Sequence, residues 1–288
     1  MESILGIDIG GTTIKGGRIV GNRIVEQFTI DTHAEEGGVK TINVLKKAIR
    51  QLKAADTNTI GIGVPSVVDK KRGIVYNAQN IKGWEEIHLK SLLEEEFKVP
   101  VYVDNDANCF AYGEKIFGKG NKFKNFVGIT LGTGVGGGII QNHHLLSDSN
   151  CGSGEFGEIP YLDSILEDYC GSRFFTREAS QTAYEIALSA KNGNKKAIDL
   201  FNEYGKHIAI LVKIIILILD PEAIIFGGSI SKSYNLFKKS MFENLNDFPY
   251  PKSVEKIKIM NSDLSNIGIL GAGALCIENN SDNLNLKK

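Results

Sequence analysis

Two glycine-rich segments decide the fold of this chain: residues 5–17 read LGIDIGGTTIKGG and residues 127–139 read VGITLGTGVGGGI. Each is a pair of short apolar runs separated by glycines, the pattern of a β-hairpin with a glycine-rich tip. An offset of 122 residues aligns their glycines, Gly6 with Gly128, Gly10 with Gly132 and Gly16 with Gly138. The match favours a duplicated domain over the alternative, a chance similarity of two glycine-rich hairpins.

Strands and helices alternate outward from both hairpins. In the first half we expect strands at 4–9, 14–20, 23–30, 59–64 and 99–103 and helices at 39–52, 89–97 and 105–117. In the second half we expect strands at 125–131, 135–141, 223–226 and 256–260 and helices at 185–191, 195–219 and 267–276, with another ending near 244. This alternation predicts an α/β protein of two domains with a cleft between them.

The composition is that of an ordinary globular protein. Its 288 residues, at about 150 residues per domain, suggest two domains. Apolar residues make up 42% of the chain and charged residues 23%, and the net charge is −1. Because no stretch is strongly basic, we expect neither nucleic acid nor a membrane surface as a partner. The start, MESILGIDIGG, lacks the basic and long apolar regions of a secretory signal, so we expect a cytoplasmic protein.

One apolar run and four cysteines complete this survey. Residues 208–219 read IAILVKIIILIL, which is too short to span a membrane and is interrupted by Lys213, so a buried core helix is expected. The cysteines form no CxxC pair, which argues against a disulfide framework and against a thiolate metal site. We expect four free thiols, at Cys109, Cys151, Cys170 and Cys276.

The two hairpin tips are candidate phosphate sites, because glycine lets the backbone approach a ligand and turn its N–H groups toward an anion. Asp8 beside the first tip makes sense chiefly if Mg²⁺ lies between it and a phosphate. Neither tip ends in the Gly-Lys-Ser/Thr of a Walker A loop, and the G-x-G-x-x-G match at Gly132, Gly134 and Gly137 continues as a strand, which argues against a dinucleotide site. A tight turn without a ligand is the alternative for either tip.

Carboxylates gather in two further segments. Residues 103–109 read VDNDANC where a strand meets a helix, and capping by Asn105 or Asp106 accounts for only part of this polar cluster. A carboxylate there can accept the proton of a substrate hydroxyl, as phosphoryl transfer requires. Residues 152–158 read GSGEFGE, a glycine-spaced carboxylate pair for which solvated loop charges are the alternative.

Eight motifs together resemble a known family. In order they are DIGGTTIKGG, IGIGVPSVVDKKRGIV, NIKGW, VDNDANC, GITLGTGVGGGI, GEFGE, IIFGGSIS and GILGAGA. They are similar to the motifs of the ROK sugar kinases, the family of bacterial glucokinases, fructokinases and N-acetylmannosamine kinases, over essentially the whole chain. The resemblance implies an actin-like (ribonuclease H-like) ATPase fold, with a small domain of residues 1–115 plus 268–288 and a large domain of residues 116–267.

The resemblance also implies roles for individual residues, with ATP and Mg²⁺ as cofactors and a sugar as substrate. Asp106 matches the general base toward the sugar 6-hydroxyl. The implied nucleotide-binding residues are Asp8, Gly10, Gly11, Thr12, Thr13, Lys15, Gly132, Thr133, Gly134, Gly227 and Gly228. The implied sugar-binding residues are Ser66, Asn80, Asn105, Asp106, Glu155, Glu158 and Glu167, with Gln79 beside Asn80.

The chain departs from the family where a zinc site is usual. The family's GEIGH and CxCGxxGC run are replaced by GEFGE, with Glu158 in place of the histidine, and by residues 159–166 without a cysteine. Cys170 alone cannot hold a tetrahedral zinc, so we expect no zinc, a pocket braced by packing and hydrogen bonds, and Glu158 in the place of the histidine.

The substrate prediction is N-acetyl-D-mannosamine over glucose. Zinc-free loops resemble those of some N-acetylmannosamine kinases of the family, and Ser66 replaces a glycine of the usual Pro-Gly pair. The alternatives are a glucokinase, an actin-like ATPase without a sugar substrate, and a sugar-responsive ROK regulator, for which Asp8 arrives too early to leave room for a DNA-binding domain. We expect a homodimer.

Overall fold

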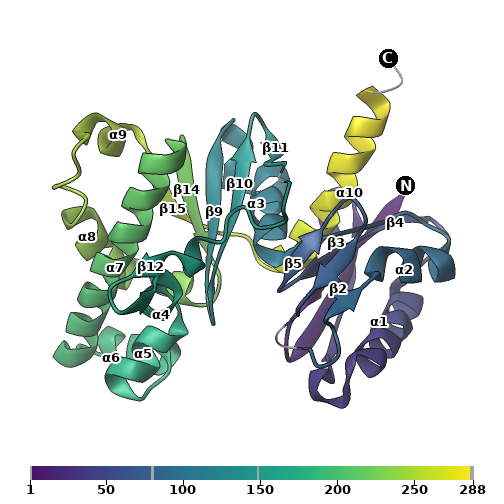
Figure 1. The fold of residues 1–288 in the computed structure, drawn as a ribbon, viewed down its shortest axis with the longest axis horizontal. Coiled ribbons are helices and arrows are strands. Elements are labelled where there is room, and N and C mark those ends of the chain that lie inside the picture. Colours follow the sequence, from purple (N-terminus) through teal and green to yellow (C-terminus); the bar gives the residue numbers. More distant parts are fainter. Residues whose placement is uncertain (1, 79–80, 148, 286–288) are drawn as a thin grey trace. The chain divides into compact units, whose positions relative to one another are not determined.

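The computed structural model describes residues 2–78, 81–147 and 149–285 (Figure 1). The chain divides into two compact units: the first comprises Met1–Asn121, His144–Ser153 and Leu264–Lys288, and the second Lys122–His143 and Gly154–Asp263. Residues 144–153 therefore belong to the first unit, although the expected boundaries put them in the large domain. One contact that holds them there is the 3.1 Å hydrogen bond from Lys70 Nζ to the carbonyl of Leu146.

The first unit is built on a sheet with the strand order β3-β2-β1-β4-β8. The strands are β1 (Ser3–Ile9), β2 (Thr13–Val20), β3 (Arg23–Asp31), β4 (Thr57–Val64) and β8 (Val101–Asn105). The first three are antiparallel neighbours, whereas β1, β4 and β8 run parallel. All five strands were expected from the sequence and are confirmed to within two residues at each end.

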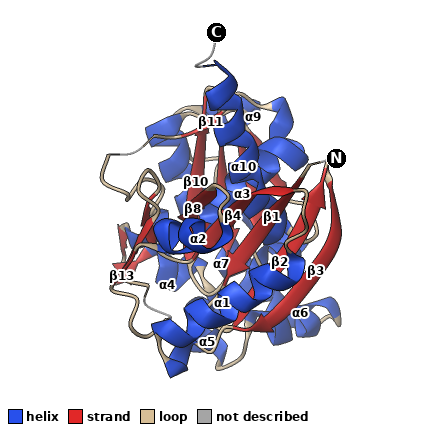
Figure 2. Ribbon diagram, turned by 90° about the vertical axis from the view of Figure 1, so that its right-hand side faces the viewer, coloured by secondary structure: helices blue, strands red, loops and turns tan. Residues whose placement is uncertain are grey.

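The two faces of this sheet are covered in different ways, because successive side chains of a strand point to opposite faces. Leu5 and Ile7 of β1 belong to a buried cluster with Leu45 of α1 (Gly38–Leu52) and Leu93 of α2 (Leu89–Phe97). Figure 2 shows α1 crossing the face of β1 and β2. Gly6, between Leu5 and Ile7, faces α10 (Ile267–Asn285) instead, so α10 lies on the opposite face.

Glycines allow α10 to lie directly on the strand backbones. A Cβ added at Gly6 would lie 2.0 Å from the Ile269 carbonyl oxygen, and one at Gly61 of β4 would lie 1.8 Å from that of Ala272. On α3 (Asp106–Phe117), a Cβ at Gly113 would lie 2.8 Å from Gly271 Cα. The GILGAGA motif is therefore the surface of a helix that packs backbone to backbone.

Replacement of Gly61 tests this packing. We expect Gly61→Ala to lower the free energy of unfolding by about 1–3 kcal/mol, because the added methyl would meet a backbone oxygen that only a shift of α10 can relieve. The matched control is Gly152→Ala, since Gly152 is exposed and a Cβ there would lie 3.9 Å from its nearest neighbour, the Asn150 carbonyl oxygen. Thermal unfolding of both variants is the measurement, and equal melting temperatures would contradict the account.

The second unit repeats the strand arrangement of the first. Within the residues of this unit its sheet has the order β10-β9-β14-β15, in which β9 pairs antiparallel with β10 and parallel with β14, as β1 does with β2 and β4. The strands are β9 (Phe126–Leu131), β10 (Val135–Gln141), β14 (Ala223–Gly227) and β15 (Lys258–Asn261), while β11 (His144–Leu145) falls among the residues of the first unit. The shared order supports the duplicated domain that the glycine pattern predicts.

The expected match of Gly16 with Gly138 is wrong by one position. Gly6 pairs with Gly17 across the first hairpin, whereas Gly128 pairs with Gly138 across the second. The first tip is one residue longer, so the second strand of that hairpin is shifted by one residue relative to a constant offset.

Helices complete the second unit. They are α4 (Leu166–Cys170), α5 (Ser172–Ala179), α6 (Ala183–Lys191), α7 (Lys195–Leu219), α8 (Tyr234–Glu243) and α9 (Pro251–Lys256). The apolar run in α7 is confirmed as a core helix, because Ile208, Leu211 and Ile215 are fully buried, while Lys213 reaches Asp247 at 2.6 Å. No helix in the described part of the chain combines the length and hydropathy needed to cross a bilayer.

Candidate functional site

The carboxyl ends of three parallel strands bring acidic residues together in the first unit. Asp8 of β1 pairs in register with Gly63 of β4, and Gly63 pairs with Asp104 of β8. Asn105 ends β8 and Asp106 begins α3. In open α/β sheets ligands bind beyond the carboxyl ends of the strands, so this edge is the candidate site of the unit.

Asn105 fixes the start of α3, as expected from the sequence. Its Oδ1 accepts hydrogen bonds from the N–H groups of Ala107 at 2.8 Å and Asn108 at 3.4 Å, and its Nδ2 donates to the Ser66 carbonyl at 3.2 Å. Asp104 Oδ1 accepts from the Asn105 N–H and from Asn108 Nδ2, both at 2.8 Å. These contacts hold the backbone that presents Asp106.

The three carboxylates lie close enough to one buried thiol to raise its pKa. Burial raises the pKa of Cys109 well above its usual value, and the negative charges of Asp104, Asp106 and Asp8 raise it further. A Cβ at Gly63 would lie 3.1 Å from Cys109 Sγ and 3.7 Å from Asp106 Cα. Because Gly63 has no side chain, Cys109 and Asp106 can pack directly against β4. The geometry thus joins Asp8 and Asp106, which are far apart in the sequence.

Asp8 is confined on the side of α10. Burial raises the pKa of the Asp8 carboxyl group, and the charge of Lys15, its register partner on β2, acts against this effect. A Cβ at Gly268 would lie 2.3 Å from Asp8 Oδ2, so the first turn of α10 closes over the carboxylate. Gly268 begins the GILGAGA motif, but no sequence motif assigns it to the site.

The first hairpin tip is a tight turn with its N–H groups available. Gly10 N–H donates to the Thr13 carbonyl at 2.9 Å. Thr32, which follows β3, donates from its N–H to the Thr12 carbonyl and from Oγ1 to the Gly10 carbonyl. Within the described residues the N–H groups of Gly11 and Thr12 have no hydrogen-bond acceptor, which suits a phosphate-binding turn.

The second hairpin tip has a similar arrangement in the second unit. Gly132 N–H donates to the Gly134 carbonyl at 3.0 Å, and Ser172 donates from its N–H to the Gly132 carbonyl at 2.9 Å. The N–H groups of Thr133 and Gly134 have no acceptor in the part of the chain that the structure describes. Val135 N–H donates to Glu167 Oε2 at 3.0 Å, so Glu167 braces the strand that leaves the tip.

The turn of Gly227 and Gly228, expected to bind the nucleotide, lies against the second tip. Gly227 pairs with Thr130 of β9. Gly228 has a φ of 86°, and a Cβ there would lie 2.3 Å from the Leu131 carbonyl oxygen, so glycine is required on both counts. Gly132, Thr133, Gly134, Gly227 and Gly228 are therefore brought together within one unit.

The GEFGE carboxylates lie close enough to Glu167 to interact. The pKa of Glu155 is raised by burial and then by the charges of Glu158 and Glu167. Gly154 holds this loop against β10, because a Cβ there would lie 2.1 Å from the Gly137 carbonyl oxygen. Three residues expected to bind sugar thus form one acidic group, and Glu167 in addition contacts the second hairpin.

An aromatic cluster occupies the segment where the family usually has zinc ligands. The segment forms a small hairpin of β12 (Pro160–Tyr161) and β13 (Ser164–Ile165). Tyr161 Oη and His207 Nδ1 are 3.1 Å apart, the rings of Tyr161 and Tyr169 meet edge to face at 5.1 Å, and Arg177 lies 4.3 Å above Tyr169. Among the described residues, no group of three or more His, Cys, Asp or Glu side chains could hold a metal ion.

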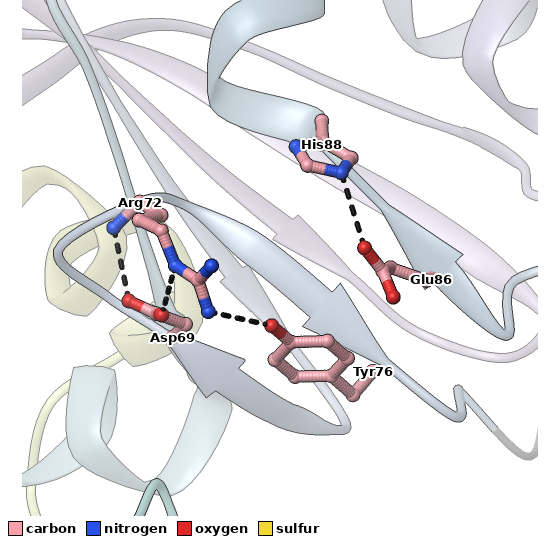
Figure 3. Close-up of polar contacts among 5 residues, drawn as sticks. All are labelled: Asp69, Arg72, Tyr76, Glu86 and His88. Atoms are coloured by element: carbon pink, nitrogen blue, oxygen red, sulfur yellow. Dashed lines mark hydrogen bonds and ion pairs between the residues drawn. The ribbon is translucent and has the colours of Figure 1, made fainter. Parts of the chain in front are cut away.

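Ser66 is anchored by a small sheet that the sequence analysis missed. This sheet consists of β5 (Val67–Asp69), β6 (Ile74–Tyr76) and β7 (Glu86–Ile87). Ser66 Oγ donates to the Tyr76 carbonyl. Arg72 binds Asp69 through its N–H and Nε and donates from Nη2 to Tyr76 Oη at 3.0 Å, and His88 contacts Glu86 (Figure 3). Asn80 and Gln79, also expected near the sugar, lie outside the described residues.

Comparison with known proteins decides the family. A sequence profile described as "ROK family" matches residues 4–279. The chain belongs to the ROK family. A glucokinase of Halalkalibacterium halodurans is 30% identical, with 94% of each chain covered, and the xylose repressor of Bacillus subtilis is 28% identical, with 95% of this chain and 77% of the repressor covered.

Solved structures place the ROK chain in the actin-like ATPase fold. The Streptomyces griseus ROK glucokinase, solved with glucose and AMPPNP, superposes with a TM-score of 0.82 at 28% identity and covers 95% of this chain and 98% of its own. Lmo2764 of Listeria monocytogenes, named as a candidate N-acetylmannosamine kinase, has a TM-score of 0.81 at 25% identity over 96% and 99%. The expected fold class is confirmed.

Removing the Asp8 charge tests the electrostatics of the site. Because the folded-state pKa of Asp8 is raised, its ionisation opposes folding at pH values above the unfolded-state pKa, and this cost is absent below it. We therefore expect Asp8→Asn to have a higher melting temperature than the wild type at pH 8 and the same one at pH 3. Calorimetry across this range is the measurement, and a difference that does not depend on pH would contradict the assignment.

Proposed function

We propose that this ROK protein is an ATP-dependent sugar kinase that transfers the γ-phosphoryl group to the 6-hydroxyl of a hexose or N-acetylhexosamine. The observation that carries the proposal is the strand register that brings Asp8 and Asp106 to one sheet edge, in the unit that also holds the first phosphate-type tip. A base at the acceptor hydroxyl and donors for phosphate oxygens are what phosphoryl transfer asks of a protein.

The contacts of the first unit suit the acceptor side of this reaction. Asp106 accepts the proton of the sugar 6-hydroxyl. The Asn105 side chain forms hydrogen bonds only with backbone groups among the contacts described above. Its amide carries two N–H groups, and only one of them donates to the Ser66 carbonyl. The second N–H can therefore donate to a sugar hydroxyl. Glu155 and Glu158 of the second unit are the proposed further ligands of the sugar.

The hairpin tips suit the nucleotide. The N–H groups of Gly11, Thr12, Thr133 and Gly134 bind phosphate oxygens, and Lys15 adds a positive charge beside Asp8. Mg²⁺ bound with the nucleotide would neutralise charge on the phosphoryl oxygens, and Asp8 is the residue that we propose would hold it, directly or through water.

N-acetyl-D-mannosamine is the proposed substrate, and glucose is the second candidate. The aromatic hairpin in place of zinc ligands, Glu158 in place of histidine and Ser66 in place of glycine favour the first. The name of Lmo2764 points the same way, whereas the names of the Halalkalibacterium and Streptomyces relatives favour glucose. Pocket differences of about 1–3 kcal/mol decide between such sugars.

A sugar-responsive regulator is the function from another class, because the xylose repressor is also a relative. A regulator that only binds a sugar does not need the proposed general base Asp106. Catalytic turnover therefore distinguishes a kinase from a regulator.

The decisive assay couples ADP release to NADH oxidation with N-acetylmannosamine, glucose, N-acetylglucosamine and fructose as acceptors. We expect the highest kcat/KM with N-acetylmannosamine. Asp106→Asn should lower kcat by roughly 10² or more, while Asp199→Asn, at an exposed position on α7, should match the wild type. Sugar-independent ADP release would support an ATPase instead, and no turnover with any sugar would refute the proposal.

Zinc content is a second test, because we propose that the aromatic cluster takes the place of zinc ligands. Elemental analysis of the purified protein should find far less than one zinc per chain. Prolonged dialysis against a chelator, followed by return of Mg²⁺, should leave both the melting temperature and kcat unchanged. Stoichiometric zinc, or a melting temperature that falls on chelation, would contradict the proposal.

A further inference from the structure

Thr32 contacts the first hairpin tip through two of its groups. Its N–H donates to the Thr12 carbonyl at 2.9 Å, and its Oγ1 donates to the Gly10 carbonyl at 2.7 Å. The side chain is fully buried, and its own carbonyl accepts a hydrogen bond from Thr41 Oγ1 of α1 at 3.2 Å. Thr32 is therefore itself held in place by helix α1.

The second tip is held in the same way by an unrelated residue. Ser172, at the start of α5, donates from its N–H to the Gly132 carbonyl at 2.9 Å and from Oγ to the Thr133 carbonyl at 3.4 Å. Thr32 follows a strand and Ser172 begins a helix, so the duplication of the hairpins does not account for the likeness. Each unit meets the same requirement with its own hydroxyl residue.

The requirement follows from the chemistry of a phosphate-binding turn. A turn carries carbonyl oxygens as well as N–H groups, and an oxygen that faced a phosphate would repel it. The clamped carbonyls of Gly10 and Thr12 point to Thr32, and the N–H groups of Gly11 and Thr12 are without an acceptor in the described ranges. Preorganised donors bind an anion without reorganising when it arrives.

We propose that Thr32 is a positioning residue for the nucleotide phosphates, acting by holding the carbonyls of the first tip away from the ligand. The proposal rests on the proposed kinase function. Thr32 does not touch the nucleotide in this account. It sets the direction of the Gly11 N–H, which shares a planar peptide group with the clamped Gly10 carbonyl and points the opposite way.

The test is calorimetric titration with MgAMPPNP in the absence of sugar. We expect Thr32→Val, which keeps the shape but loses the hydroxyl donor, to weaken binding roughly three- to tenfold. Thr32→Ser, which retains the donor, should restore affinity to within about twofold. Ser172→Ala should have a smaller effect than Thr32→Val, because it loses only the 3.4 Å bond and keeps the backbone bond.

The matched control is Thr59→Val. Thr59 is a buried threonine of β4, 3% exposed, whose Oγ1 contacts Asn58 rather than the tip. The Thr59→Val variant should lower the melting temperature about as much as Thr32→Val does, and it should leave the affinity for MgAMPPNP unchanged. Equal weakening by both variants, or unchanged affinity in Thr32→Val, would overturn the inference alone. A wild type that binds no MgAMPPNP would overturn the proposed function as well.

Discussion

The rest of the candidate site depends on the parallel register of β1, β4 and β8. Asp8, Gly63 and Asp104 occupy aligned positions on these strands, and Asp106 follows where β8 turns into α3. A slip of one residue would turn every side chain of a strand to the other face of the sheet, and would take Asp8 away from the start of α3. The register is specified because the apolar residues that alternate with Asp8 belong to a buried core.

Glycine serves two separate purposes in this protein. At Gly6, Gly61 and Gly113 it lets α10 approach strand and helix backbones, which fixes the layer beneath the site. In the hairpin tips it leaves backbone N–H groups open to an anion. The two units share a strand order, yet their tips are one residue different in length and are clamped by different residues, Thr32 in one and Ser172 with Glu167 in the other. The two units therefore differ at the tips that we propose bind the nucleotide phosphates.

The sequence predicts the elements of this fold well, because the hairpins, the Asn105 cap and the apolar run of α7 are local patterns. The small sheet of β5, β6 and β7 escapes such patterns because its strands are two or three residues long. Thr32 and Ser172 were missed for a different reason: each acts on a tip far away in the sequence, and a lone hydroxyl residue carries no local signal. The contact of Glu167 with Val135 likewise arises only when α4 packs beside β10. The match to the family profile shows the family but leaves the sugar open.

Our central claim is that the chain transfers a phosphoryl group from ATP to one particular oxygen of a sugar. Proton–phosphorus correlated NMR of a reaction containing MgATP and N-acetylmannosamine tests this claim most directly. The account predicts a new phosphate ester whose phosphorus couples to the two protons on carbon 6 of the sugar. A phosphorus coupled to the anomeric proton, or inorganic phosphate as the sole new phosphorus signal besides ADP, would contradict it.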